Sequence, residues 1–170
     1  MKPFAKIPTQ IPRSGIREIM DLAWSVEKTG PVIHLEVGQP DFSTPSHIIE
    51  ATCRYARDGH TKYVPNAGVD ELRIAAANYF HRRSGVATEP KQIVVTPGAV
   101  MSIATAFLSI LEPGDEVLLP DPGWPNYHMA ASLVHSKPVF YDLRAKDNFL
   151  PDLDQLEKLV TDRTKLILLS

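Results

Sequence analysis

Short apolar strands alternate with helix-length segments through the second half of this 170-residue chain, and this alternation restricts its fold more than any other feature. Strands are predicted at residues 93–95, 117–119, 139–143 and 166–169, with helices at residues 98–111 and 125–134 and after Asp152. Such alternation is typical of an α/β fold with a largely parallel sheet. Strands that are apolar without alternation are expected where helices cover both faces of the sheet.

The residue pattern in the first half of the chain predicts an N-terminal arm, three helices and one short strand. Residues 1–13 are predicted to be an irregular arm, and Ser14 is placed to cap a helix over residues 15–29. Residues 32–37 alternate apolar and polar side chains as a short strand does. Further helices are predicted from Pro45 to about residue 58 and over residues 70–83. The buried stripe expected on the last of these helices consists of Leu72, Ala76, Tyr79 and Phe80.

Composition argues against several classes of function. The net charge is -2, with both signs dispersed, so nothing favours binding to nucleic acid or to an anionic membrane. No apolar run approaches the roughly 20 residues that a membrane helix needs, and no signal peptide is visible. The single cysteine, Cys53, cannot form an internal disulfide and is interpreted as buried and inert. The histidines lack metal-ligand spacing, so we expect no metal. Because no signal peptide or membrane helix is predicted, we expect a soluble, cytoplasmic protein.

Ligands of open α/β sheets bind at the carboxyl ends of the strands, which directs attention to two loops and to whatever follows Ser170. The turn at Pro97-Gly98 joins a strand to a helix, and the N–H groups of Ala99 and Val100 would lie at the helix N-terminus, where phosphate binds well. A plain turn without a ligand explains the same residues. Trp124 follows the next strand between two prolines, either as a plate for stacking on a planar ring or as a core side chain.

Five motifs occur in one order along the chain: VGQPDF, KYVPNAGVDELR, IVVTPGA, EPGDEVLLPDPGWPNY and TDRTKLILLS. This succession resembles the class I/II aminotransferases of the aspartate-aminotransferase type, which are fold type I pyridoxal-phosphate enzymes. The resemblance implies part of the large domain of that fold: a three-layer α/β/α arrangement with a mostly parallel, incomplete sheet. It also implies that residues 1–45 form an arm, helix and strand of the small domain and active-site rim. Residues 46–170 would then begin the cofactor-binding large domain.

The resemblance implies roles for individual residues. Gly98, Ala99 and Val100 match the segment that holds the phosphate of pyridoxal 5'-phosphate, although many relatives carry a second glycine and a side-chain donor there. Trp124 matches the aromatic residue that stacks on the cofactor ring. Tyr63 matches a tyrosine that reaches the phosphate in the neighbouring subunit of a homodimer, and Gly38 matches a glycine near the substrate carboxylate. The small-molecule substrates implied are an amino acid and a 2-oxo acid.

The sequence also departs from the family pattern at its end. In relatives, the strand ending in TKLILLS continues into an Asn-Pro-x-Asn-Pro loop, and the Schiff-base lysine follows later. The chain is therefore expected to be an N-terminal fragment that contains no catalytic lysine and is inactive alone. Lys137 follows a serine as the family lysine often does, but Pro138 comes next and the position enters a different strand. A carbon–sulfur lyase, a synthase resembling aminocyclopropane-carboxylate synthase, and a non-catalytic truncated product remain as alternatives.

Overall fold

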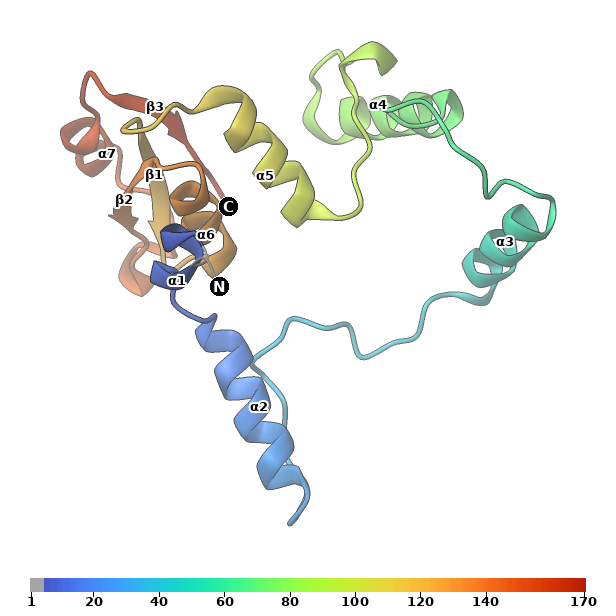
Figure 1. Cartoon of the computed structure of the whole chain (residues 1–170), viewed down its shortest axis with the longest axis horizontal. Coiled ribbons are helices and arrows are strands. Elements are labelled where there is room, and N and C mark those ends of the chain that lie inside the picture. The colour runs from blue at the N-terminus through green and yellow to red at the C-terminus, as the bar shows by residue number, and fades with distance from the viewer. Residues whose placement is uncertain (1–4) are drawn as a thin grey trace. The chain divides into compact units, whose positions relative to one another are not determined.

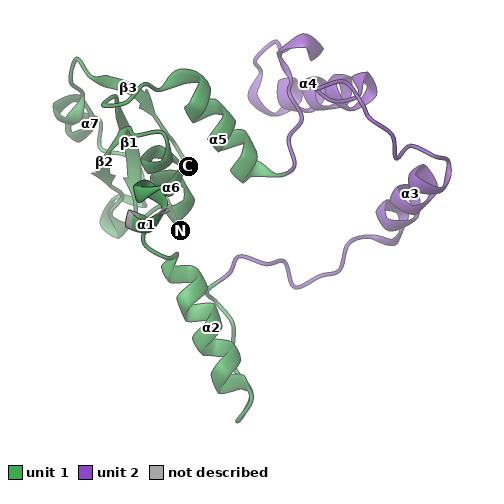
Figure 2. Ribbon diagram, in the orientation of Figure 1, with its two compact units in different colours: residues 1–36, 98–170 green, residues 37–97 purple. Residues whose placement is uncertain are grey.

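The computed structural model describes residues 5–170, which divide into two compact units (Figure 2). The first unit combines residues 1–36 with residues 98–170, and the second consists of residues 37–97. Each unit is considered by itself below. Among the described residues, no helix combines the length and the apolar content that crossing a membrane requires.

The first unit is built on a three-stranded parallel sheet in the order β2-β1-β3 (Figure 1). The central strand β1 spans Glu116–Asp121, β2 spans Lys137–Asp142 and β3 spans Thr164–Ile167. Helices connect these strands, as parallel neighbours require. The α/β class predicted from the sequence is therefore confirmed, and the ends of these three strands differ from the predicted ends by one or two residues.

Three helices accompany the sheet: α5 (Ala99–Ile110), α6 (Pro125–Leu133) and α7 (Leu153–Leu159). The Asp152 side chain accepts hydrogen bonds from the backbone N–H groups of Asp154 and Gln155, which caps α7 as predicted. A short 3₁₀ turn, η2 (Ala145–Asp147), follows β2.

The core of the first unit lies between the sheet and one pair of helices. Alternate residues of a strand share a face, so Val117 and Leu119 of β1 point to the same side. There they are buried with Phe107 of α5, Leu111 at its end and Ala131 of α6. This packing fixes α5 and α6 on one face of the sheet, and Figure 1 shows α7 on its other side.

The opposite face of β1 is buried as well. Leu118 is fully shielded from solvent, and so is Tyr141 of β2, whose hydroxyl donates a 2.7 Å hydrogen bond to the backbone oxygen of Leu168. The prediction that the central strand is apolar because both of its faces are covered is confirmed.

A buried carboxylate joins the amino ends of all three strands. Glu116 accepts hydrogen bonds from Thr161 (2.7 Å), from the Nζ of Lys137 (3.1 Å) and from the guanidinium of Arg163 (2.9 Å). The hydrogen bonds from Thr161 and Lys137, and the charges of Lys137 and Arg163, lower the pKa of Glu116 from its ordinary value of 4.5. Without such partners, a carboxylate buried to this degree would be costly.

The N-terminal part of the first unit contains α1 (Lys6–Gln10) and α2 (Gly15–Glu27). The strand predicted at residues 32–37 is wrong: these residues are irregular, with a bend at Glu36 and Val37, and pair with no described strand. Ile33 and Leu35 are each 88% exposed. An isolated extended segment has no neighbour to satisfy its backbone donors and acceptors, so alternation alone does not make a strand.

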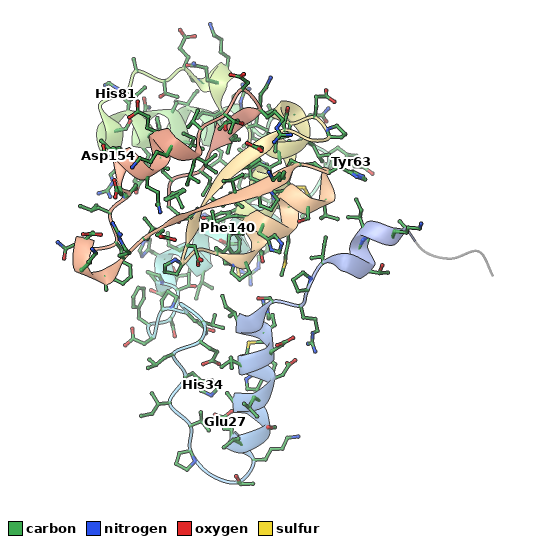
Figure 3. The ribbon with its side chains drawn as sticks, turned by 90° about the vertical axis from the view of Figure 1, so that its left-hand side faces the viewer. Glu27, His34, Tyr63, His81, Phe140 and Asp154 are labelled. Atoms are coloured by element: carbon green, nitrogen blue, oxygen red, sulfur yellow. The ribbon has the colours of Figure 1, made fainter. Side chains whose placement is uncertain are left out.

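His34 links this segment to the end of α2 (Figure 3). Its Nδ1 lies 2.7 Å from Glu36 and its Nε2 lies 3.4 Å from Glu27. The hydrogen bond with Glu36, and then the one with Glu27, raises the pKa of His34 above its ordinary value of 6.5. The two carboxylates thus favour the charged imidazolium.

The second unit contains α3 (Ser46–Arg57), α4 (Asp70–Ser84) and the short turn η1 (Pro90–Gln92). The predicted buried stripe of α4 is wrong. Leu72, Tyr79 and Phe80 are about half exposed, and the buried residue of α4 is Ala77. Within this unit α4 packs mainly against η1, which is too short to cover the large apolar side chains.

Two further expectations fall in the second unit. Cys53 is exposed on α3, so its interpretation as a buried side chain is wrong. Residues 93–96 form no strand, although the Val95 N–H donates a 3.0 Å hydrogen bond to the Ala67 carbonyl. Both differences have one cause: the unit presents no described sheet against which these residues could pack.

Candidate functional site

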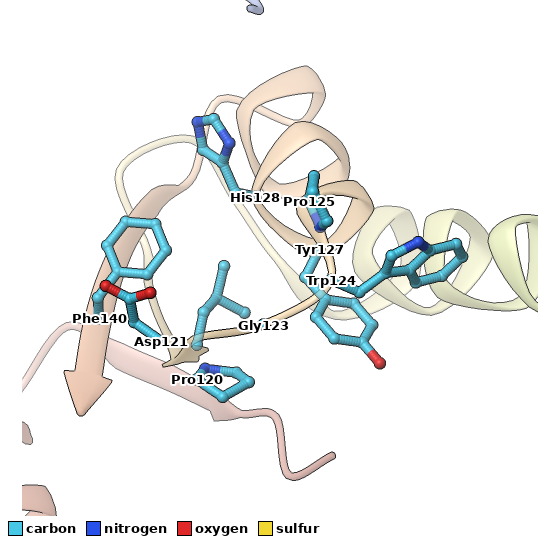
Figure 4. A pocket seen from close by; sticks show the side chains of 9 residues that line it. Pro120, Asp121, Gly123, Trp124, Pro125, Tyr127, His128 and Phe140 are labelled. Carbon is cyan, nitrogen blue, oxygen red and sulfur yellow. The ribbon is translucent and has the colours of Figure 1, made fainter. Parts of the chain in front are cut away.

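The loop after β1 carries Trp124 at the carboxyl edge of the sheet. Trp124 is the N-cap residue of α6, and Pro125 occupies the first helical position, where its fixed φ suits the helix. Its indole is half-buried. In Figure 4, the indole of Trp124 and the side chain of Asp121 extend to opposite sides of the loop.

A small pocket of about 110 Å³ lies around this loop. Asp121, Trp124, Tyr127, His128 and Phe140 are among the side chains that line it (Figure 4). The floor of the pocket comes from the ends of β1 and β2 and its wall from the first turn of α6. It combines aromatic surface with one carboxylate and one imidazole, and no lysine is among the described residues that line it.

The turn that begins α5 lies at the same edge of the sheet. A short turn at residues 112–115 joins the end of α5 to the start of β1, and α5 packs along the sheet. The helix therefore runs opposite to β1, with its first turn toward the carboxyl end of the strand. Gly98 is the N-cap at φ 91°, and no side chain caps the helix.

The first turn of α5 suits an anion. The leading N–H groups of a helix have no partner within the helix and carry a partial positive charge. At α5 these groups belong to residues that include Ala99 and Val100, both exposed. A Cβ built on Gly98 meets no atom within 4 Å, so there is open space on that side of the residue. The structure thus brings Gly98, Ala99, Val100 and Trp124 to one edge of one unit.

Tyr63 and Gly38 belong to the other unit. The side chain of Tyr63 is fully exposed, and the space around Gly38 is open, with no atom within 4 Å of an added Cβ. Because these two residues are in residues 37–97, their placement near the cofactor stays a prediction.

Lys137 does not have the position or the free ammonium group that a Schiff-base lysine needs. It is the first residue of β2, at the amino edge of the sheet, whereas Trp124 follows the carboxyl edge of β1. Its ammonium is engaged with Glu116. This position agrees with its rejection as a candidate on sequence grounds.

Tyr127 is the residue that sequence reasoning missed. Its ring meets that of Trp124 at a centroid distance of 5.5 Å with an interplanar angle of 87°. Its hydroxyl lies 3.2 Å from the Oγ of Ser170, beyond β3. The signal available in the sequence was its spacing, since a residue three positions after a helix N-cap lies one turn away on the same side.

The residues present fit the two halves of pyridoxal 5'-phosphate that they would contact. The first turn of α5 offers the N–H groups of Ala99 and Val100 to a phosphate, and the half-buried Trp124 offers an aromatic surface to a ring. A parallel α/β sheet with these two features at one carboxyl edge is the architecture of the fold type I transferases.

The family model for aminotransferase class I and II matches residues 30–170, and the chain belongs to this family. It is 41% identical over 160 residues to an aspartate aminotransferase of Pyrococcus horikoshii, covering 94% of this chain and 40% of that protein. A bifunctional aspartate and glutamate/aspartate-prephenate aminotransferase of Petunia hybrida is 41% identical over 152 residues, which are 89% of this chain and 32% of that protein.

Solved structures show the same relationship. An aspartate aminotransferase of Thermus thermophilus superposes with a TM-score of 0.92 at 31% identity, covering 99% of this chain and 44% of that one. An alanine aminotransferase of Pyrococcus furiosus gives 0.90 at 34% identity, with 97% and 43% covered. The chain thus spans about two-fifths of the length of these relatives.

Proposed function

We propose that this chain is the phosphate- and ring-binding part of a pyridoxal-phosphate-dependent aminotransferase, which transfers an amino group between an amino acid and a 2-oxo acid. The observation that carries the proposal is the pairing of Trp124 with the first turn of α5 at one carboxyl edge of the sheet. Membership of the aminotransferase family supports it.

In this proposal, the backbone of residues 98–100 binds the phosphate and Trp124 holds the ring. The partial positive charge of a helix N-terminus stabilises a bound anion by roughly 0.3–2 kcal/mol. Stacking on an aromatic side chain contributes about 0.5–1.5 kcal/mol beyond burial of the surface. Pyridoxal phosphate supplies the electron sink for the reaction, while the protein orients it.

The remaining roles are proposed from the family resemblance. Tyr63 donates its hydroxyl to the phosphate in the neighbouring subunit of a homodimer, and Gly38 lets the substrate carboxylate approach the backbone. Both positions are exposed, which leaves them accessible to such groups. The exposed, unpaired thiol of Cys53 suits a reducing compartment, and we propose the cytoplasm.

Binding of pyridoxine 5'-phosphate tests the proposal directly. This compound carries the ring and the phosphate but lacks the aldehyde, so it does not react with surface lysines. Calorimetric titration should show binding, and removing either the phosphate or the ring from the probe should weaken it. Trp124→Ala should lower the affinity by about two- to tenfold, the equivalent of one stacking contact.

Trp24→Phe is the matched control, because Trp24 is a half-exposed tryptophan on α2 and is expected to contribute nothing to the site. Its affinity should equal that of the parent protein. If Trp124→Ala also binds like the parent, Trp124 does not hold the ring. If the parent binds neither pyridoxine 5'-phosphate nor inorganic phosphate, the proposed function is wrong.

A further inference from the structure

The orientation of Trp124 involves a side chain that is not among the proposed cofactor-binding residues. A residue at a helix N-cap lies where the chain changes direction, and its own backbone hydrogen bonds do not fix its side chain. For Trp124 the fixing contact is Tyr127, one turn further along α6. The Tyr127 N–H donates to the Trp124 carbonyl at 3.1 Å, and the two rings meet at 87°.

Tyr127 is held at both ends. Its ring packs against the buried cluster that includes Phe107 and Leu119, so it belongs to the edge of the core. Its hydroxyl is 3.2 Å from the Oγ of Ser170 in the segment after β3. Tyr127 therefore connects the core and the last residues of the chain to the indole of Trp124.

The perpendicular contact has a consequence for binding. A ring that meets the indole at 87° covers at most one of its two faces, whereas a parallel ring would compete with a planar ligand. Perpendicular and offset arrangements are also the preferred geometries of aromatic pairs. The Tyr127 ring can thus hold the indole without covering both of its faces.

We propose that Tyr127 is a positioning residue that holds Trp124 ready to stack on the ring of the cofactor. The inference rests on the proposed function, because it concerns the same site. Ordering a side chain at the moment of binding costs about 0.5–1.5 kcal/mol, so a protein that has already ordered it binds roughly two- to tenfold more tightly.

The experiment uses the full chain with Trp24→Phe, which leaves Trp124 as the only tryptophan. The near-ultraviolet circular dichroism of Trp124 reports how rigidly its ring is held, and quenching of its fluorescence reports binding of pyridoxine 5'-phosphate. Tyr127→Leu should lose most of the tryptophan dichroism and bind the probe about two- to tenfold more weakly. Tyr127→Phe keeps the ring contact, so it should retain the dichroism and bind within about twofold of the parent.

Tyr141→Phe separates positioning from general stability. It removes the hydroxyl that binds the Leu168 carbonyl, in the same segment as Ser170, while no contact joins Tyr141 to Trp124 among the described interactions. Tyr141→Phe should lower the melting temperature and leave the Trp124 dichroism unchanged. Far-ultraviolet dichroism measures the folded fraction of each variant. The near-ultraviolet signals of Trp124 are then compared at equal folded fraction.

Two results would overturn the inference. If the parent binds the probe, and Tyr127→Leu keeps both its affinity and the Trp124 dichroism, Tyr127 positions nothing while the proposed function stands. If Tyr127→Phe loses as much dichroism as Tyr127→Leu, the ring contact is not what holds the indole. If the parent binds neither pyridoxine 5'-phosphate nor inorganic phosphate, the proposed function is wrong. The positioning role of Tyr127 is then wrong as well, because it rests on that function.

Discussion

Trp124 and Tyr63 illustrate how differently two aromatic residues at a proposed site can be placed. Trp124 is half-buried at the start of α6 and touches Tyr127, so its surroundings are defined by its own unit. Tyr63 is fully exposed in the other unit. Its exposure leaves the ring and the hydroxyl of Tyr63 accessible to a partner or a ligand.

We predict that Tyr63 acts across the interface of a homodimer. Tyr63→Phe should weaken phosphate binding about tenfold or more, since a hydrogen bond to a charged group contributes roughly 1.5–3 kcal/mol. A mixed dimer of one Tyr63→Phe subunit and one Trp124→Ala subunit then distinguishes the two arrangements. If Tyr63 serves the neighbouring site, both changes fall in one site and the other keeps its full affinity for pyridoxine 5'-phosphate.

If Tyr63 instead serves the site of its own subunit, each site of the mixed dimer carries one change and no site of full affinity remains. That titration result would contradict the prediction. Homodimers of each single variant provide the two reference affinities.

At the scale of the elements, the buried Glu116 links the amino ends of the three strands through hydrogen bonds and ion pairs. It receives Lys137 from β2 and Thr161 and Arg163 from the segment that enters β3. A group whose pKa is lowered on folding contributes stability that is fully present above its unfolded pKa. This contribution is lost as the pH falls through the lowered pKa of the folded state.

We therefore predict that acid weakens the sheet through Glu116, beginning below its ordinary pKa of 4.5. Between roughly pH 5.5 and 3, the melting temperature of the parent should fall more steeply than that of Glu116→Gln, which has no charge to lose. Glu157→Gln, on the exposed surface of α7, is the control and should follow the parent. Parallel pH profiles for the parent and Glu116→Gln would show that another group governs acid unfolding.

At the scale of the whole molecule, a large amount of apolar surface faces solvent. Ile33, Leu35, Leu108, Leu153 and Leu169 are each at least 70% exposed. The outer edges of β2 and β3 have no partner strand in the described part of the chain. Exposed apolar patches and open strand edges both promote association.

We predict that the purified 170-residue chain binds a hydrophobic dye strongly, unfolds over a broad temperature range and aggregates as its concentration rises. Dye fluorescence, calorimetry and light scattering measure these three properties. A monomeric sample with a sharp melt and little dye binding would contradict the prediction.

We also predict that this 170-residue chain shows no transaminase turnover above the rate of free pyridoxal phosphate. General acid–base catalysis typically contributes about 10²–10⁴-fold and requires a group placed at the reacting atoms. No lysine lines the pocket beside Trp124, and Lys137 is engaged with Glu116 at the opposite edge of the sheet. A coupled amino-acid/2-oxo-acid assay with free cofactor as the blank provides the measurement. Turnover that is abolished by changing one lysine of this chain would contradict the prediction that the chain is inactive.

The sequence by itself determined the α/β class, the positions of α2, α5, α6 and α7, and the strands of the parallel sheet. These features depend on local periodicity, on caps such as Asp152 and on apolar runs, all of which are short-range signals. The resemblance added the candidate residues Gly98, Ala99, Val100 and Trp124, and the structure brings these to one edge of the sheet.

Only the tertiary structure decided which patterns acquire partners. Residues 32–37 and 93–96 have the composition of strands, yet they are not strands, because a strand exists only when a neighbour satisfies its backbone. The stripe of α4 and Cys53 were expected to be buried and are exposed, because burial depends on what packs against a helix. The perpendicular contact of Tyr127 with Trp124, and its link to Ser170 43 residues away, likewise arise when separate elements meet in space.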